Sequence, residues 1–285
     1  MPRTGVVTDT TACIPPEMAT QLGIEVLPLY LAFGDATYAD GVAAQAAEFY
    51  EKLRTAVRPP STSAPSPGGY AEAILRAGRD AESVVCITVA KQFSHMLDAA
   101  SQGAALAREQ APGLDIRVVD STAAAMAQGF VTIEAARAAK EGACADEVIA
   151  RAEALMPRVQ LVVVLDTLHY LAKSGRVPRL IVWAASPLQL KPIVSLQRGV
   201  YKPVTFVRTM PRAVDRLVQE LERRAGTAAL HVCVHHTNVP REAEELAERV
   251  RARLQPKELL VREFTQVMGV HTGPGLLGFA IYTEP

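Results

Sequence analysis

The sequence predicts an α/β protein of two domains, and three observations lead to that prediction. Short apolar stretches alternate with helical stretches along most of the chain, as in doubly wound α/β folds. Some of these stretches, such as 83–89, are continuously apolar, which is typical of parallel strands buried on both faces. The length of 285 residues suffices for two domains. We expect a doubly wound parallel sheet in residues 1–157 and a mixed α/β domain in residues 158–285.

The elements of the first domain follow from apolar runs and from helix start signals. Gly5–Thr8 is expected to be a strand that ends in the polar turn Asp9-Thr10-Thr11. Pro15-Pro16-Glu17 opens a helix that Gly23 closes. Periodicity predicts further strands at 24–33, 83–89 and 116–120, a turn at 38–41, and helices at 46–57, 69–77, 96–110, 126–141 and 145–155.

The second domain differs because two of its strands are expected to be antiparallel. Residues 191–196 and 199–208 predict a hairpin around the turn Gln197-Arg198-Gly199. The other expected elements are strands at 159–165, 229–235, 259–264 and 276–282, and helices at 168–172, 211–224 and 240–254. Residues 266–275 are predicted to form a polar turn, because His271 lies there among glycines at 269, 273 and 275.

Composition excludes several classes of function. Thirty basic residues balance thirty acidic ones, so no net charge indicates a nucleic-acid partner or a membrane surface. The four cysteines are far apart in the sequence and have no metal-ligand spacing. No apolar run is long enough for stable membrane insertion. We therefore expect a cytoplasmic protein without a metal site.

A Ser/Pro-rich segment, residues 58–69, lies between two predicted helices. Its prolines restrict the backbone, and its hydroxyls at Ser61, Thr62, Ser63 and Ser66 are possible donors just before a helix N-terminus. These features indicate a small pocket for a carboxylate or a phosphate. The alternative is a capping and turn loop that binds no ligand.

Three cationic or titratable residues are further candidates for anion binding. His271 can donate a hydrogen bond to a carboxylate, or it can be bonded within its own turn. Arg176 lies on a basic turn and Arg208 at a strand end, where each either binds an anion or is simply solvated.

Three other chemistries are disfavoured. His235-His236 lacks a third metal ligand, and Lys91 lacks the glycine-rich loop of a phosphate-binding lysine. No Gly-x-Ser-x-Gly nucleophile motif occurs in the sequence.

Together, the polar turns resemble the DegV family of bacterial fatty-acid-binding proteins. The resemblance runs in order along nearly the whole chain. Its matching segments are 7–12 (family TDST), 38–42 (RDGV), 61–68 (TTSQPSPG), 119–121 (VIDS), 165–177 (LDTLEYLRKGGRI), 191–193 (KPI), 207–208 (VRG) and 270–275 (AHTGPG).

The resemblance implies that a long-chain fatty acid lies in an apolar tunnel at or near the interface of two α/β domains, with no metal and no cofactor. Thr62 and His271 would hold the carboxylate, and we add Ser63 and Thr272 as neighbouring candidates. Some family members present the acid to a separate ATP-binding fatty acid kinase subunit, which phosphorylates the carboxylate. The residues matching Arg176 and Arg208 are implicated there in partner docking or phosphotransfer. The chain itself is then not an enzyme.

One segment departs from the family. Where the family has SSGLSGTY, this chain has Ala90–Leu97, so the paired serines fall on Ala90 and Lys91, and only Ser94 is kept. The Lys91 ammonium either replaces a hydroxyl as a charge-assisted donor or points to solvent in an altered site. The alternative function is an enzyme acting on a small carboxylate or phosphorylated substrate with His271 as acid/base. A lipid-sensing regulatory module would share the same pocket.

Overall fold

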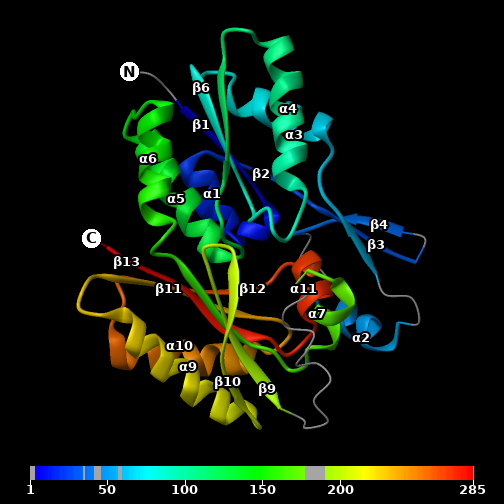
Figure 1. Ribbon diagram of the computed structural model, residues 1–285, viewed down its shortest axis with the longest axis vertical. Helices are drawn as coiled ribbons and strands as arrows, with labels where there is room; N and C mark the ends of the chain where they lie inside the picture. Colours follow the sequence, from blue (N-terminus) through cyan, green and yellow to red (C-terminus); the bar gives the residue numbers. More distant parts are fainter. Residues whose placement is uncertain (1–3, 35, 42–45, 57–59, 177–189, 285) are drawn as a thin grey trace.

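The computed structural model describes residues 4–34, 36–41, 46–56, 60–176 and 190–284. The amino-terminal lobe is built on a parallel sheet of four strands in the order β2-β1-β6-β7 (Figure 1). These strands are β1 (Thr4–Asp9), β2 (Ile24–Leu27), β6 (Ser83–Thr88) and β7 (Asp115–Asp120). Every residue of β6 is buried, as its continuous apolar run predicts.

Helices cover both faces of this sheet, which confirms the predicted doubly wound class (Figure 1). One face carries α3 (Pro67–Ala77) and α4 (Met96–Gln110), and the other carries α1 (Pro16–Leu22), α5 (Met126–Lys140) and α6 (Ala145–Leu155). A short 3-10 helix, η1 (Thr10–Ala12), follows β1.

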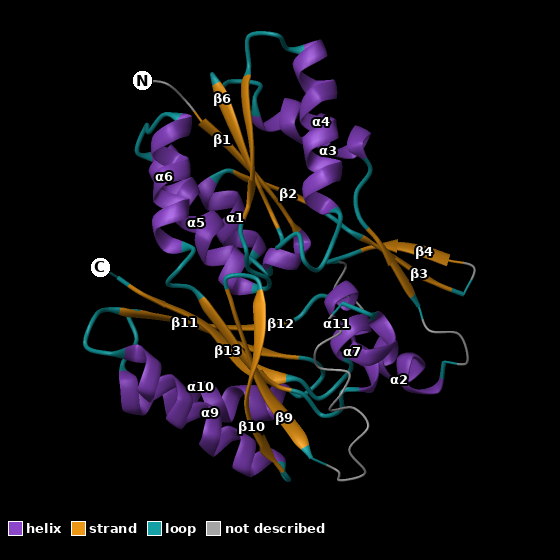
Figure 2. Cartoon of the chain, viewed as in Figure 1, coloured by secondary structure: helices purple, strands orange, loops and turns teal. Residues whose placement is uncertain are grey.

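A small antiparallel sheet projects from the side of the molecule (Figure 2). It consists of β3 (Tyr30–Phe33), β4 (Ala36–Ala39) and β5 (Ser61–Ser63) in the order β4-β3-β5. The predicted single strand at 24–33 is therefore wrong. Pro28 has no amide hydrogen and cannot continue a ladder, so the chain leaves the parallel sheet there and begins a second strand.

The same small sheet corrects two other predictions. The expected turn at 38–41 is partly strand β4, and the middle of the Ser/Pro-rich segment is strand β5 rather than loop. Arg58 and Pro59 of that segment lie outside the described residues. Helix α2 (Ala46–Thr55) precedes it.

The carboxy-terminal lobe is built on a mixed sheet of six strands in the order β10-β9-β8-β13-β11-β12. They are β8 (Gln160–Val164), β9 (Lys191–Gln197), β10 (Val200–Val207), β11 (Leu230–His236), β12 (Glu258–Glu263) and β13 (Leu277–Thr283). The β9–β10 pair is the predicted antiparallel hairpin. Helices α9 (Met210–Ala225) and α10 (Pro240–Leu254) pack on one face of this sheet. The short helices α7 (His169–Ser174) and α11 (Gln266–Thr272) lie beside one end of the sheet (Figure 1).

The other face of the mixed sheet packs against α5 of the amino-terminal lobe (Figure 1). Eleven of the fifteen residues of α5 are buried, as expected for a helix between two sheets. Phe130 on α5 contacts Tyr282 on β13 with ring centroids 5.0 Å apart, and one apolar cluster includes core residues of both lobes. The two lobes thus share one continuous core, and the domain boundary at residue 157 stays a prediction. Among the described residues, no helix is long and apolar enough to cross a membrane.

Candidate ligand-binding site

A cavity of about 620 Å³ lies at the carboxyl edge of the parallel sheet, where the two lobes meet. Each of the four parallel strands leads directly into its wall: Thr11 follows β1, Leu29 follows β2, Val89 follows β6 and Ala124 follows β7. The facing wall comes from α7, β10 and α11. This is the edge at which open parallel sheets bind ligands, as the sequence predicts.

Much of the cavity wall is apolar. Its apolar side chains are Leu29, Ala64, Val89, Phe93, Met96, Ala124, Leu171, Tyr201, Val267 and Met268. Phe93 and Tyr201 come from different lobes, and their ring centroids lie 5.1 Å apart. The wall can therefore surround a long apolar ligand.

The central polar contact of the cavity joins Thr62 to His271. Thr62 Oγ1 lies 2.9 Å from His271 Nε2, although the two residues are 209 positions apart in the sequence. Thr62 is placed by β5, where it pairs opposite the buried Leu31 of β3. His271 is placed by the last turn of α11. The structure thus brings together the two residues for which the sequence predicts carboxylate binding.

The segment that carries His271 is a helix rather than the predicted polar turn. Residues 266–272 form α11, and only the residues from Gly273 onward leave the helix. Glycine is required within it because a Cβ at Gly269 would lie 2.5 Å from the hydroxyl oxygen of Tyr50. Gly269 therefore serves close packing of α11 against α2, whereas Gly273 and Gly275 follow the helix and have positive φ angles.

Burial keeps the His271 ring neutral. Burial, together with the smaller effect of the nearby Arg176 guanidinium, lowers the pKa of His271 to about 4. In a neutral imidazole one nitrogen donates and the other accepts. If Nε2 carries the hydrogen, it donates to Thr62 Oγ1 and leaves the Thr62 hydroxyl hydrogen for a ligand. His271 Nδ1 is buried and has no hydrogen-bond partner within the described part of the chain.

The other predicted residues occupy less central places on the wall. Ser63, Lys91, Ser94 and Thr272 all line the cavity. Ser63 is exposed and follows Thr62 in β5, so its side chain points to the opposite face of the strand. Thr272 already donates its hydroxyl to Met268 O at 3.1 Å. Lys91 is exposed.

The two predicted arginines separate. Arg176 lines the cavity, whereas Arg208 is exposed just beyond β10 and is not among the described lining residues.

A smaller cavity of about 310 Å³ adjoins the first one on the far side of the Thr62–His271 pair. The two cavities share four residues: Thr62, Ser174, Arg176 and His271. The smaller one also contains cationic or titratable side chains that the sequence analysis did not select for a site, namely Arg54, His169 and Lys173. The polar pair thus stands between an apolar-lined space and a cation-lined space.

A buried carboxyl group supports the floor of the larger cavity and was missed by sequence analysis. Asp9 accepts hydrogen bonds from Thr11 N at 2.9 Å, Gln128 Nε2 at 3.0 Å and Val89 N at 3.3 Å. Burial raises the pKa of Asp9 to about 6 despite these donors. The contacts join the ends of β1 and β6 to α5, next to two lining residues.

His235 joins the lobes and does not bind metal in this arrangement. Its Nε2 accepts from Met126 N at 3.1 Å, and its Nδ1 lies 3.1 Å from Arg262 O. Both ring nitrogens are therefore used, and burial lowers the pKa to about 3. Among the described residues, no group of three His, Cys, Asp or Glu side chains is arranged to hold a metal ion.

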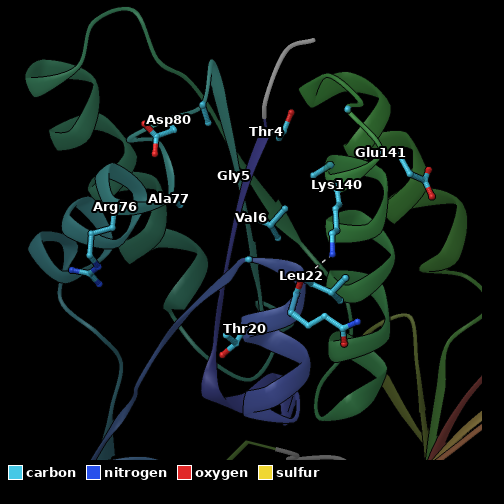
Figure 3. Close-up of a pocket in the computed structure, with 15 residues that line it drawn as sticks. Thr4, Gly5, Val6, Thr20, Leu22, Arg76, Ala77, Asp80, Lys140 and Glu141 are labelled. Atoms are coloured by element: carbon cyan, nitrogen blue, oxygen red, sulfur yellow. Dashed lines mark hydrogen bonds between the residues drawn. The ribbon is translucent and has the colours of Figure 1, made fainter.

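A third hollow, of about 720 Å³, lies at the opposite edge of the parallel sheet, between α1, α3 and α5 (Figure 3). Of its four charged lining residues, Arg76, Asp80, Lys140 and Glu141, all but Asp80 make a polar contact within the described part of the chain. Arg76 contacts Glu25 at 2.7 Å, Lys140 donates to Gln21 O at 3.2 Å, and Arg151 contacts Glu141 at 3.5 Å. The described lining residues of this hollow include no counterpart of the Thr62–His271 pair.

The doubly wound sheet, the mixed sheet and the cavity where they meet define an α/β protein of two lobes with a cavity between them. The chain belongs to the DegV family, because the family model described as "Uncharacterised protein, DegV family" matches residues 3–284.

Individual relatives agree over nearly their full lengths. A DegV domain-containing protein of Streptomyces coelicolor is 35% identical, with 97% of each chain covered. A Thermus thermophilus DegV family protein, whose structure is described by its fatty acid binding, superposes with a TM-score of 0.90 at 27% identity, covering 99% of this chain and 100% of that one. Bacillus subtilis DegV, described as a fatty acid binding protein, gives a TM-score of 0.87 at 28% identity, with both chains covered completely.

We expect His271 to make the free energy of unfolding fall on acidification. The ordinary pKa of 6.5 applies to the unfolded chain and about 4 to the folded one, so the unfolded chain takes up the proton first. Stability that is present above pH 6.5 is therefore lost as the pH falls toward 4, by up to about 3 kcal/mol. Urea unfolding followed by circular dichroism measures it. His271→Asn should lose less stability over this range; equal losses would show that His271 does not contribute.

Proposed function

We propose that this protein binds a long-chain fatty acid, with the acyl chain in the apolar part of the larger cavity and the carboxylate at Thr62 and His271. The observation that carries the proposal is the place of this polar pair, at the junction of an apolar-lined cavity and a cation-lined one. Burial of an acyl chain contributes about 0.8 kcal/mol per methylene group. The carboxylate must meet hydrogen-bond donors at the end of the acyl chain, and in this proposal the Thr62 hydroxyl supplies one.

The similarity to fatty-acid-binding DegV proteins of Thermus thermophilus and Bacillus subtilis supports this ligand class. The alternative, an enzyme with His271 as general acid/base, has weaker support. A general acid or base works best when its pKa is close to the working pH, and that of His271 is about 4. The same ring serves well as a neutral hydrogen-bonding group.

Lys91 is proposed to pair with the ligand carboxylate from the rim of the cavity. It follows β6, at the sheet edge where ligands bind, and it lines the cavity while remaining exposed. Its stem can bend toward the ligand while the ammonium stays partly hydrated. In this role it replaces one of the paired serines of the family.

We further propose that the bound acid is presented to an ATP-binding fatty acid kinase subunit, which phosphorylates the carboxylate. The cation-lined cavity beside Thr62 and His271 supports this step, because Arg54, Lys173 and Arg176 can attract a phosphoryl group. Arg208 is exposed away from both cavities, which suits a contact with the partner rather than with the lipid.

Thr62→Val is expected to weaken fatty-acid binding by about tenfold to a hundredfold. Valine keeps the shape of threonine but removes the hydroxyl, and a hydrogen bond to a charged group is worth about 1.5–3 kcal/mol. Titration calorimetry with palmitate, after delipidation of the protein, measures the dissociation constant. Thr205→Val, on strand β10, is the matched control and should bind like the wild type. Unchanged affinity in Thr62→Val removes Thr62 from the site.

Lys91→Met should weaken binding of the same acid by on the order of 2 kcal/mol, because it keeps the apolar stem and removes the charge. Lys202→Met is the matched control, since Lys202 is also exposed but lies on β10 outside both cavity walls. Equal affinities of the two variants would mean that Lys91 is an ordinary solvated charge.

Arg176→Gln and Arg208→Gln test the presentation step. Both variants should keep their fatty-acid affinity, while acyl-phosphate formation by a cognate kinase subunit falls by about tenfold or more. The coupled assay follows ATP consumption with lipid-loaded protein. A parallel loss of lipid affinity would instead assign the affected arginine to carboxylate binding.

A further inference from the structure

Asp40 is a buried acid that lies outside the cavity wall and contacts three separate parts of the chain. It is only 4% exposed. Its Oδ1 accepts from Val267 N at 3.1 Å, its Oδ2 accepts from Thr10 Oγ1 at 2.7 Å, and its own backbone N–H donates to Leu29 O at 2.7 Å. Both carboxylate oxygens and the backbone of Asp40 are thus fixed.

The contact with Val267 replaces a missing helix cap. The first amide groups of any helix lack partners within the helix. Thr265 is the N-cap residue of α11 and has the extended backbone that capping requires. Its side chain makes no capping bond, and its Oγ1 is buried with no hydrogen-bond partner among the residues that the structure describes. The Asp40 carboxylate, 227 positions away in the sequence, accepts from the second helical residue instead. A negative charge at this end also interacts favourably with the helix dipole.

Helix α11 depends on such a contact because it is short. Its seven residues are too few for a helix that is stable by itself in water. Val267 and His271 are four positions apart, so about one helical turn, or roughly 6 Å, separates the anchored amide from the ring. A shift at the start of α11 is therefore transmitted to the His271 ring.

We propose that Asp40 is a positioning residue for the carboxylate site: by holding the start of α11 it places His271 beside Thr62. It acts through α11 and does not touch the ligand. Its second oxygen holds Thr10, which precedes the lining residue Thr11. Asp40 therefore sets two walls of the cavity relative to each other. The effect of Asp40 on ligand affinity rests on the proposed binding of fatty acids. Its effect on the position of α11 does not.

The first measurement is an NMR titration of the His271 imidazole in lipid-free protein. In the wild type the ring should titrate near pH 4, as its burial implies. Loss of the Asp40 charge by itself makes the imidazolium less favourable and lowers this midpoint. Release of α11 exposes the ring and raises the midpoint toward its ordinary value. The two effects have opposite signs, so the titration separates them.

We expect Asp40→Ala to raise the His271 midpoint to above about 5. Asp40→Asn, which keeps an acceptor oxygen for Val267 N, should leave the midpoint at or below about 4. The exposed Asp98→Ala is the control and should match the wild type. A midpoint at or below that of the wild type in folded Asp40→Ala overturns the proposal. If Asp40→Ala does not fold, Asp40→Glu replaces it in the test. Glutamate keeps the negative charge but displaces the carboxylate from Val267 N, so the proposal requires the His271 midpoint to rise above that of the wild type.

The second measurement is the dissociation constant for palmitate. Asp40→Ala should bind about tenfold more weakly, and Asp40→Asn should remain within about threefold of the wild type. Equal weakening in both variants would mean that the charge, rather than the position of α11, matters, and would contradict the proposal. Failure of the wild type to bind palmitate would refute the proposed function instead; the lipid-free titration alone then decides the role of Asp40.

Discussion

The hydrogen bond between Thr62 and His271 is the contact on which the site depends, and no local feature of the chain creates it. The two residues are 209 positions apart and lie on two of the smallest elements of the structure, a three-residue strand and a seven-residue helix. Neither element is stable alone. The strand is held by its pairing with β3 and the helix by Asp40 and by packing against Tyr50. The Thr62–His271 pair, which we propose as the carboxylate site, is thus a product of tertiary structure.

The shared core explains how such small elements keep a fixed geometry. Helix α5 lies between the parallel sheet and the mixed sheet, and its buried, mostly small residues let both sheets approach closely. Contacts such as Phe130–Tyr282 and Met126–His235 join α5 to strands of the carboxy-terminal lobe. Because close-packed interiors resist deformation, the walls that carry Thr62 and His271 are held at a fixed separation. An apolar ligand between them can then be surrounded without large rearrangement.

Sequence reasoning predicted those features that depend on local pattern. The strands of the parallel sheet, the β9–β10 hairpin and the long helices were all predicted from apolar periodicity, and Thr62 and His271 from residue type together with family resemblance. It failed in two ways. The local signal of Pro28, at which the chain leaves the parallel sheet, was not used, and elsewhere tertiary contacts override local signals: pairing with β3 makes residues 61–63 of the Ser/Pro-rich segment a strand. The glycines near His271 concealed a helix, because its cap comes from Asp40 and its packing partner is Tyr50. The cations of the smaller cavity come from α2 and α7, whose proximity no local pattern reveals.

The most direct test of the account is native mass spectrometry of the protein purified from cells without added lipid. The account predicts a complex whose mass exceeds that of the chain by one long-chain fatty acid, released intact when the protein is denatured. Palmitate added to folded, delipidated protein should restore a complex of one chain and one fatty acid. A ligand-free mass that stays unchanged in the presence of excess palmitate would contradict it.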